Sequence, residues 1–155
     1  MKRKAVSPKK HLGQHFLNDE AIAHRIAHSV TSNGDQTVIE IGPGTGALTT
    51  HLVNQHGSRL IAVDVDEESI AHLRNESWID SGQLLLADIL KVPLTELTLS
   101  TEIVIAGNFP YNISSQILFT VLEHRAHIPE LVGMFQKEVA LRVASNHGSK
   151  AYGIL

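Results

Sequence analysis

The 155-residue chain is expected to form an α/β domain around a doubly wound, mainly parallel sheet. Short β-branched or aliphatic runs alternate with amphipathic stretches of helical periodicity, and this alternation is typical of parallel strands joined by crossover helices. The first apolar run leads into a glycine-rich segment at 42–46, as a strand, a tight turn and a helix would. A composition of 43% hydrophobic and 19% charged residues is that of one globular domain.

The periodicities place each element in order. The five expected strands are residues 37–41, 59–63, 83–87, 102–106 and 130–135. The first expected helix has the apolar face Ile22, Ile26 and Val30, and the others are a segment ending near 56 and residues 67–76, 113–125 and 137–145. Asn18 or Asp19 is expected to cap the first helix and Asp66 the third, since their side-chain oxygens accept from free backbone N–H groups.

Residues 1–10 are expected to be a flexible basic arm. Of the chain's 13 basic residues, five lie there without an acidic neighbour: Lys2, Arg3, Lys4, Lys9 and Lys10. The whole chain nevertheless has a net charge of −3, so a basic arm precedes an acidic body. Such an arm suits a polyanion such as RNA, and a solubilising tail is the alternative.

Composition excludes several classes of protein. The absence of cysteine excludes disulfides, cysteine–zinc sites and a cysteine nucleophile, and it fits a reducing cytoplasm. No window approaches the roughly 18 uncharged apolar residues of a membrane span, so no membrane partner is expected. The ten histidines show no metal-ligand motif, and no metal site is expected.

Ligands of doubly wound sheets bind beyond the carboxyl ends of the strands. The glycines at 42–46 let a ligand approach the backbone and present N–H groups at a helix N-terminus. Asp64 follows Gly42 by 22 positions, where an acid that binds ribose hydroxyls is expected. Asp88, at the third strand end, is either an acceptor for an adenine amine or a helix cap. These residues indicate a nucleoside cofactor and leave NAD and S-adenosylmethionine both open.

Segment 108–111, which reads Asn-Phe-Pro-Tyr, suits alkylation of an amine on a planar base. The Asn108 side-chain oxygen and a nearby carbonyl, aimed by the stiff Pro110, can accept both hydrogens of one exocyclic amine. Tyr111 offers the base a stacking face. Accepting the two hydrogens localises the nitrogen lone pair and stabilises the developing positive charge, so no strong base is needed.

Five segments occur in an order that resembles the small-subunit ribosomal RNA adenine dimethyltransferases over residues 9–155: 13–19, 40–46, 108–114, 135–139 and 148–153. The resemblance implies a Rossmann-like S-adenosylmethionine-dependent methyltransferase. It implies methyl transfer to the N6 amines of two adjacent adenosines in a hairpin near the 3′ end of small-subunit rRNA. The expected setting is ribosome biogenesis in the cytoplasm, with a monomer acting on the pre-ribosomal small subunit.

The resemblance also implies roles for single residues. His15 and Leu17, with Gln14 beside them, would line the methionine end of the cofactor. Gly42 would contact the cofactor through its backbone, Asp64 would hold the ribose and Asp88 the adenine amine. Asn108 would touch both cofactor and target amine, Pro110 would offer its carbonyl, and Tyr111 would stack on the flipped adenine. The sequence departs from the family pattern at His15, Asp64 and Phe109, where asparagine, glutamate and leucine are common.

Family members continue through two more strands and a small helical domain that helps to grip RNA. Residues 11–155 are therefore expected to be a cofactor-binding catalytic domain whose last strands are missing and whose C-terminal helical domain is absent. An NAD-dependent oxidoreductase on the same fold and a non-catalytic RNA-binding ribosome assembly factor are alternatives, and a DNA adenine methyltransferase is a further one. The amine clamp favours methyl transfer, because hydride transfer has no use for it.

Overall fold

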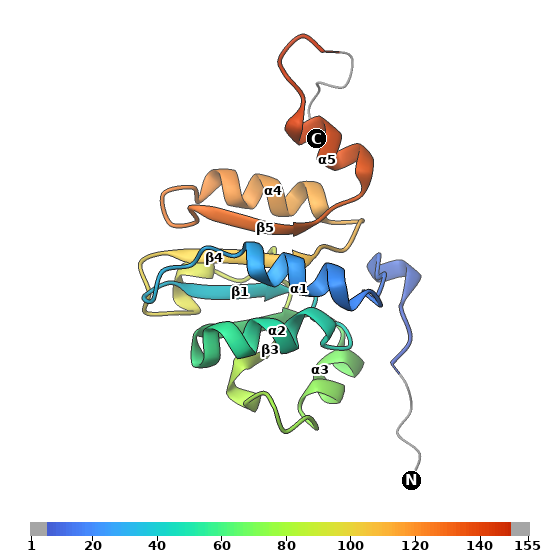
Figure 1. Ribbon diagram of the computed structural model, residues 1–155, viewed down its shortest axis with the longest axis vertical. Helices are drawn as coiled ribbons and strands as arrows, with labels where there is room; N and C mark the ends of the chain where they lie inside the picture. Colours follow the sequence, from blue (N-terminus) through green and yellow to red (C-terminus); the bar gives the residue numbers. More distant parts are fainter. Residues whose placement is uncertain (1–5, 150–155) are drawn as a thin grey trace.

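The sheet has five strands in the order β3-β2-β1-β4-β5, and every neighbouring pair is parallel (Figure 1). The computed structural model describes residues 6–149. The strands are β1 (Thr37–Ile41), β2 (Leu60–Asp64), β3 (Leu84–Leu86), β4 (Ile103–Asn108) and β5 (Glu130–Met134). Strand order reverses beside β1, because β2 and β3 extend the sheet on one side and β4 and β5 on the other. The predicted doubly wound α/β fold is confirmed.

The helices begin close to where the sequence places them. They are α1 (Glu20–Ser29), α2 (Ala47–His56), α3 (Glu67–Leu73), α4 (Ser114–Glu123) and α5 (Lys137–Ala144). Residues 6–149 also contain four short 3-10 turns, of which η1 precedes α1 and the others lie in connections to strands: η1 (Lys10–Leu12), η2 (Gly57–Arg59), η3 (Ser81–Gln83) and η4 (Leu94–Glu96). Asp19 caps α1 and Asp66 caps α3 through side-chain oxygens, so both predicted caps are confirmed.

Alternate residues of the central strands build two apolar layers. Val38 and Val104 pack with α1 and α2 on one face, whereas Ile39 and Ile105 pack with α4 on the other. All five residues of β1 are buried, as expected for a strand covered on both faces. Each fully buried aliphatic side chain contributes roughly 1.5–3 kcal/mol to the stability of the folded state. Burial of the central strands on both faces of the sheet fixes the positions of the strand ends, and the functional loops start from these ends.

The prediction that the fourth strand ends at Ala106 was wrong by two residues. β4 continues to Asn108 because β5 supplies partners there: Gly107 pairs with Gly133 and Asn108 with Met134. A Cβ on Gly107 would lie 2.8 Å from the carbonyl oxygen of Ile41, so the close approach of β4 to the end of β1 at this position requires glycine. Asn108 is therefore the last residue of a central strand, and its pairing with Met134 of β5 positions its backbone.

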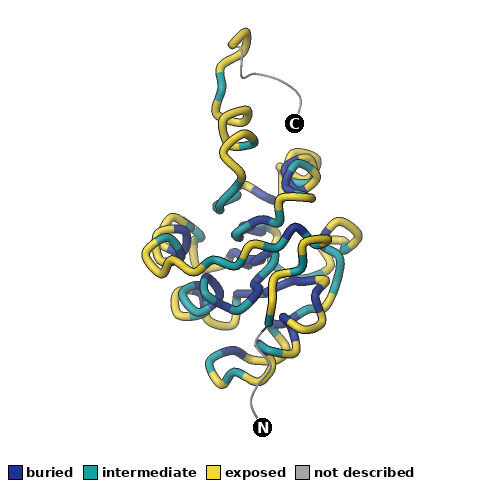
Figure 2. Tube along the Cα trace, turned by 90° about the vertical axis from the view of Figure 1, so that its right-hand side faces the viewer, coloured by how far each residue is buried: buried dark blue, intermediate teal, exposed yellow. Residues whose placement is uncertain are grey.

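The outer edge of the sheet is less covered than its centre. β5 is only partly buried, and α5 has no buried residue, as Figure 2 shows. None of the helices within residues 6–149 is long and apolar enough to cross a membrane. The predicted arm residues Lys2, Arg3 and Lys4 lie outside the described residues, as does the apolar segment 152–155.

Candidate active site

A cavity of about 310 Å³ opens beyond the carboxyl ends of β1, β2 and β4, where strand order reverses. Eight of the predicted site residues line it: Gln14, His15, Leu17, Gly42, Asp64, Asp88, Asn108 and Pro110. Tyr111 is not among the lining residues, although its ring centroid lies 5.3 Å from that of His15. Residues from five separate parts of the chain thus line one cavity.

The glycine-rich loop between β1 and α2 forms the floor of the cavity. Gly42, Gly44 and Gly46 have φ values of 71°, 56° and 91°, a region that favours glycine. A Cβ on Gly46 would lie 2.8 Å from the side chain of Leu73, the last residue of α3, so the loop also packs closely against α3. The loop delivers the N-terminus of α2 to the cavity, where Ala47 is a lining residue. Its free N–H groups suit a polar or anionic part of a ligand.

Asp64 and Asp88 follow neighbouring strands. Asp64 is 7% exposed, lines the cavity and accepts from the backbone N of Asp66 at 2.9 Å. Burial raises the pKa of Asp64, and backbone N–H groups of Asp66 and Gly44 oppose that shift. Asp88 accepts from the backbone N of Leu90 at 3.1 Å and pairs with Lys91 at 3.2 Å. Asp88 therefore closes a turn and lines the cavity.

Asn108 reaches the cavity from the end of β4 with its amide held in one orientation. Its Nδ2 donates to the carbonyl oxygen of His15 at 2.7 Å, which leaves Oδ1 as the atom available to accept from a ligand. The ring of Pro110 lies 3.5 Å from the position of a Cβ on Gly42, so the proline packs against the glycine loop. The Pro110 carbonyl accepts from the backbone N of Ile113 at 3.2 Å and keeps a second lone pair.

Glu40 is a residue of the site to which the sequence reasoning gave no role. Its side chain lies in the middle of the sheet, 1% exposed, and it lines the cavity. Its Oε2 atom is buried without a hydrogen-bond partner. Burial raises the pKa of Glu40 to about 8, the Thr49 hydroxyl opposes the shift, and Asp64 adds to it. The available signal was a single carboxylate inside the apolar run of residues 37–41.

The residues before α1 use their polar atoms mainly within the protein. Gln14 accepts from the backbone N of Lys9 at 2.8 Å and donates to Asp66 at 2.9 Å. Leu17 packs on the layer formed by α1 and α2. Among the predicted RNA-binding residues, Lys9 pairs with Asp66, and Lys10 starts η1. Both lysines thus belong to the folded part, and the expected arm is shorter than residues 1–10.

A family model described as "Ribosomal RNA adenine dimethylase" matches residues 5–155. The chain belongs to this family. Two curated relatives are named ribosomal RNA small subunit methyltransferase A. The one from Cytophaga hutchinsonii is 48% identical over 150 residues, covering 96% of this chain and 58% of the relative. The one from Flavobacterium johnsoniae is 46% identical over 150 residues, covering 97% and 57%. The chain spans little more than half the length of these relatives.

Solved structures of family-like enzymes share the fold. A dimethyladenosine transferase from Plasmodium falciparum is 28% identical with a TM-score of 0.68, covering 90% of this chain and 50% of that one. The 23S rRNA methyltransferase ErmE is 27% identical with a TM-score of 0.71, covering 86% and 53%. The Rossmann-like methyltransferase architecture that the sequence predicted is therefore confirmed for this family member.

Proposed function

We propose that this chain carries the cofactor and acceptor sites of an S-adenosylmethionine-dependent rRNA adenine N6-dimethyltransferase. Its substrate is two adjacent adenosines in a hairpin near the 3′ end of small-subunit rRNA. It acts as a monomer on the pre-ribosomal small subunit in the cytoplasm. Family membership supports the substrate class. The observation that carries the proposal is the fixed amide of Asn108, whose free oxygen belongs to the same cavity as Asp64 and the glycine loop.

The cavity fits a cationic nucleoside cofactor. Oε2 of Glu40, buried without a hydrogen-bond partner, can interact with a donor or positively charged group of the ligand, and the carboxylate of Asp64 suits a ribose hydroxyl. We assign Gly42 to backbone contact with the cofactor, Asp88 to its adenine amine, and His15 and Leu17, with Gln14 beside them, to its methionine end. S-adenosylmethionine supplies an electrophilic methyl group when bound.

The protein's contribution to the reaction is to hold the target amine. Asn108 Oδ1 and the Pro110 carbonyl accept its two hydrogens, which directs the nitrogen lone pair towards the methyl group. Tyr111, 38% exposed, stacks on the flipped adenine. The nitrogen would form a bond to the methyl carbon as the carbon–sulfur bond of the cofactor breaks, with S-adenosylhomocysteine as the leaving group, and would then release one proton to water. Repetition on the same amine gives the dimethyl product.

Calorimetric titration with S-adenosylmethionine tests the cofactor assignment, with NADH as the competing ligand. Selective binding of S-adenosylmethionine supports it, and binding of NADH alone refutes it. Transfer of labelled methyl groups to small-subunit rRNA then tests the acceptor site with two variants. Asn108→Ala should lose at least about 100-fold in transfer, as oxyanion-type donors do, while its cofactor affinity changes only several-fold. Asn75→Ala is the matched control, because Asn75 is exposed, follows the C-terminal end of α3, and its side chain donates only to the Ala71 carbonyl among the described residues. Equal turnover in the two variants would exclude the amine clamp.

A further inference from the structure

Residues 9–15, here called the strap, run across the mouth of the cavity from the end of β2 to the end of β4. Leu12, Gln14 and His15 of the strap are among the residues that line the cavity. The strap includes η1 and then turns at Gly13, which has a φ of 63°. In Figure 1 this segment lies at the ends to which the strand arrows point. A ligand that fills the cavity therefore contacts the strap directly.

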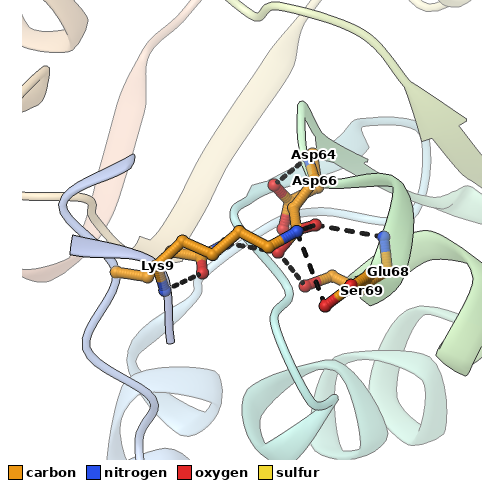
Figure 3. A network of polar contacts seen from close by, with 6 residues as sticks. Lys9, Asp64, Asp66, Glu68 and Ser69 are labelled. Atoms are coloured by element: carbon orange, nitrogen blue, oxygen red, sulfur yellow. Dashed lines mark hydrogen bonds and ion pairs between the residues drawn. The ribbon is translucent and has the colours of Figure 1, made fainter. Parts of the chain in front are cut away.

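Lys9 and Gln14 of the strap both bind Asp66, a carboxylate only 1% exposed (Figure 3). Lys9 Nζ donates to Asp66 Oδ1 at 2.5 Å, and Gln14 Nε2 donates to Oδ2 at 2.9 Å. Two further donors, the backbone N of Glu68 and the Ser69 hydroxyl, lie at 3.0 and 3.2 Å. Burial opposes ionisation of Asp66, but Lys9, Gln14 and the Glu68 N–H together hold its pKa below the ordinary value. Asp66 is thus a charged acceptor with two of its four donors in the strap.

Backbone carbonyls of the strap, at Lys10, Gly13 and His15, accept hydrogen bonds from Asn108 and from Tyr111, which follows β4. Asn108 Nδ2 donates to the His15 carbonyl at 2.7 Å, and the backbone N of Tyr111 donates to the Gly13 carbonyl at 3.3 Å. The Tyr111 hydroxyl donates to the Lys10 carbonyl at 3.1 Å. In these contacts the donors come from the acceptor segment and the strap contributes backbone carbonyls. Substitution of Asp66 or Lys9 leaves the acceptor residues Asn108 and Tyr111 in place, so the connection to Asp66 is the one that variants can test separately.

Asp66 also touches the cofactor side of the site through its backbone. Its N–H donates to Asp64 Oδ1 at 2.9 Å, so the residue that holds the strap also orients the acid assigned to the ribose. The contacts with the strap and with Asp64 are both made by Asp66, the residue that caps the N-terminus of α3. A displacement of Asp66 would therefore loosen the strap and turn Asp64 together.

We propose that Asp66 is a positioning residue that fastens the strap over the cavity and so sets how long the cofactor stays bound. This inference rests on the proposed function, because it takes S-adenosylmethionine as the ligand. Bound ligand leaves when the strap moves away from Asp66, which breaks the contacts that Lys9 and Gln14 make with this residue. The expected signature is a change in the dissociation rate with little change in the association rate.

Asp66→Asn and Lys9→Met are the variants that test the proposal. Asparagine keeps the helix cap, so Asp66→Asn removes the charge without removing the first hydrogen bond of α3. Lys9→Met keeps the apolar stem and removes the ammonium group. Glu68→Gln is the matched control, because Glu68 is 51% exposed and lies 3.6 Å from the same ammonium group. It removes one negative charge beside Lys9 without touching the buried carboxylate.

Stopped-flow measurement of S-adenosylmethionine release should show dissociation faster by about 10-fold or more in Asp66→Asn and in Lys9→Met. In the double variant dissociation should be no faster than in the faster single variant, because both substitutions remove the same contact between Lys9 and Asp66. Glu68→Gln should stay within about twofold of the wild type. Equal dissociation rates in wild type and Asp66→Asn would overturn the inference and leave the proposed function intact, and so would additive effects in the double variant.

Hydrogen exchange of the ligand-free protein provides a readout that does not depend on the cofactor. The backbone N–H groups of Gly13 and Gln14 donate to the carbonyls of Lys10 and Lys9 within the strap. Their exchange should accelerate in Asp66→Asn while that of the central strands stays unchanged. If the wild type binds no S-adenosylmethionine, the proposed function fails and exchange alone decides whether Asp66 fastens the strap. Unchanged exchange at Gly13 and Gln14 would overturn that too.

Discussion

Replacing Glu40 with glutamine should remove a large part of the pH dependence of folding stability. In the folded protein burial raises the pKa of this carboxyl group from 4.5 to about 8. Between those values the folded chain holds a proton that the unfolded chain has released. The free energy of unfolding therefore falls as pH rises, by about 1.4 kcal/mol per pH unit for this one group. Its favourable contribution is complete below the unfolded pKa and is lost by about pH 8.

The magnitude to measure is a difference between two profiles. From about pH 5.5 to about pH 7.5, wild type should lose about 2.7 kcal/mol more than Glu40→Gln does. The cost of burying the glutamine amide is the same at both pH values and cancels. Urea unfolding can be followed by fluorescence of Trp78, the single tryptophan. Glu123→Gln, at the exposed end of α4, is the control and should follow the wild-type profile. Parallel profiles for wild type and Glu40→Gln would refute the assignment of a buried, protonated carboxyl group.

Three further outcomes are expected from other parts of the molecule. Asp64→Asn keeps the contact from the Asp66 N–H but loses the charge that we assign to the ribose, so calorimetry should show S-adenosylmethionine binding weakened about 10- to 100-fold. Replacing Lys2, Arg3 and Lys4 with glutamine should lower the slope of log affinity against log salt for single-stranded rRNA by about 2, and an unchanged slope would make the arm a solubility tail. Gly133→Ala places a methyl group against the neighbouring β4 backbone, so thermal unfolding should show a loss of about 2–3 kcal/mol.

Local patterns in the sequence were sufficient to place β1, the glycine-rich loop and two helix caps. The run at 37–41 and the glycines after it determine β1, the loop and the start of α2 without help from distant residues. The caps at Asp19 and Asp66 were equally local, since each donor lies two or three residues away. These elements were predicted because their causes lie within one window of the chain.

The features that were not predicted depend on distant partners. Lys9 and Asp66 are 57 positions apart, and nothing in either neighbourhood says that they meet, so Lys9 was read as part of a solvated arm. The length of β4 depends on β5, which supplies the partner of Asn108. Glu40 was seen as part of a motif, but its burial follows from the sheet being covered on both faces. Tertiary packing, not propensity, decides all three.

The hydrogen bond from Asn108 to the His15 carbonyl makes the amide one-sided towards any ligand. An amide free to rotate would present either its oxygen or its nitrogen and would tolerate a base carrying an amine or an oxo group. With the nitrogen committed, an incoming oxo oxygen would face another lone pair and be repelled, while an amine would be accepted. Discrimination of adenine from a deaminated or oxo-substituted purine thus needs no contact with the rest of the base. A single backbone carbonyl in the N-terminal segment enforces that choice.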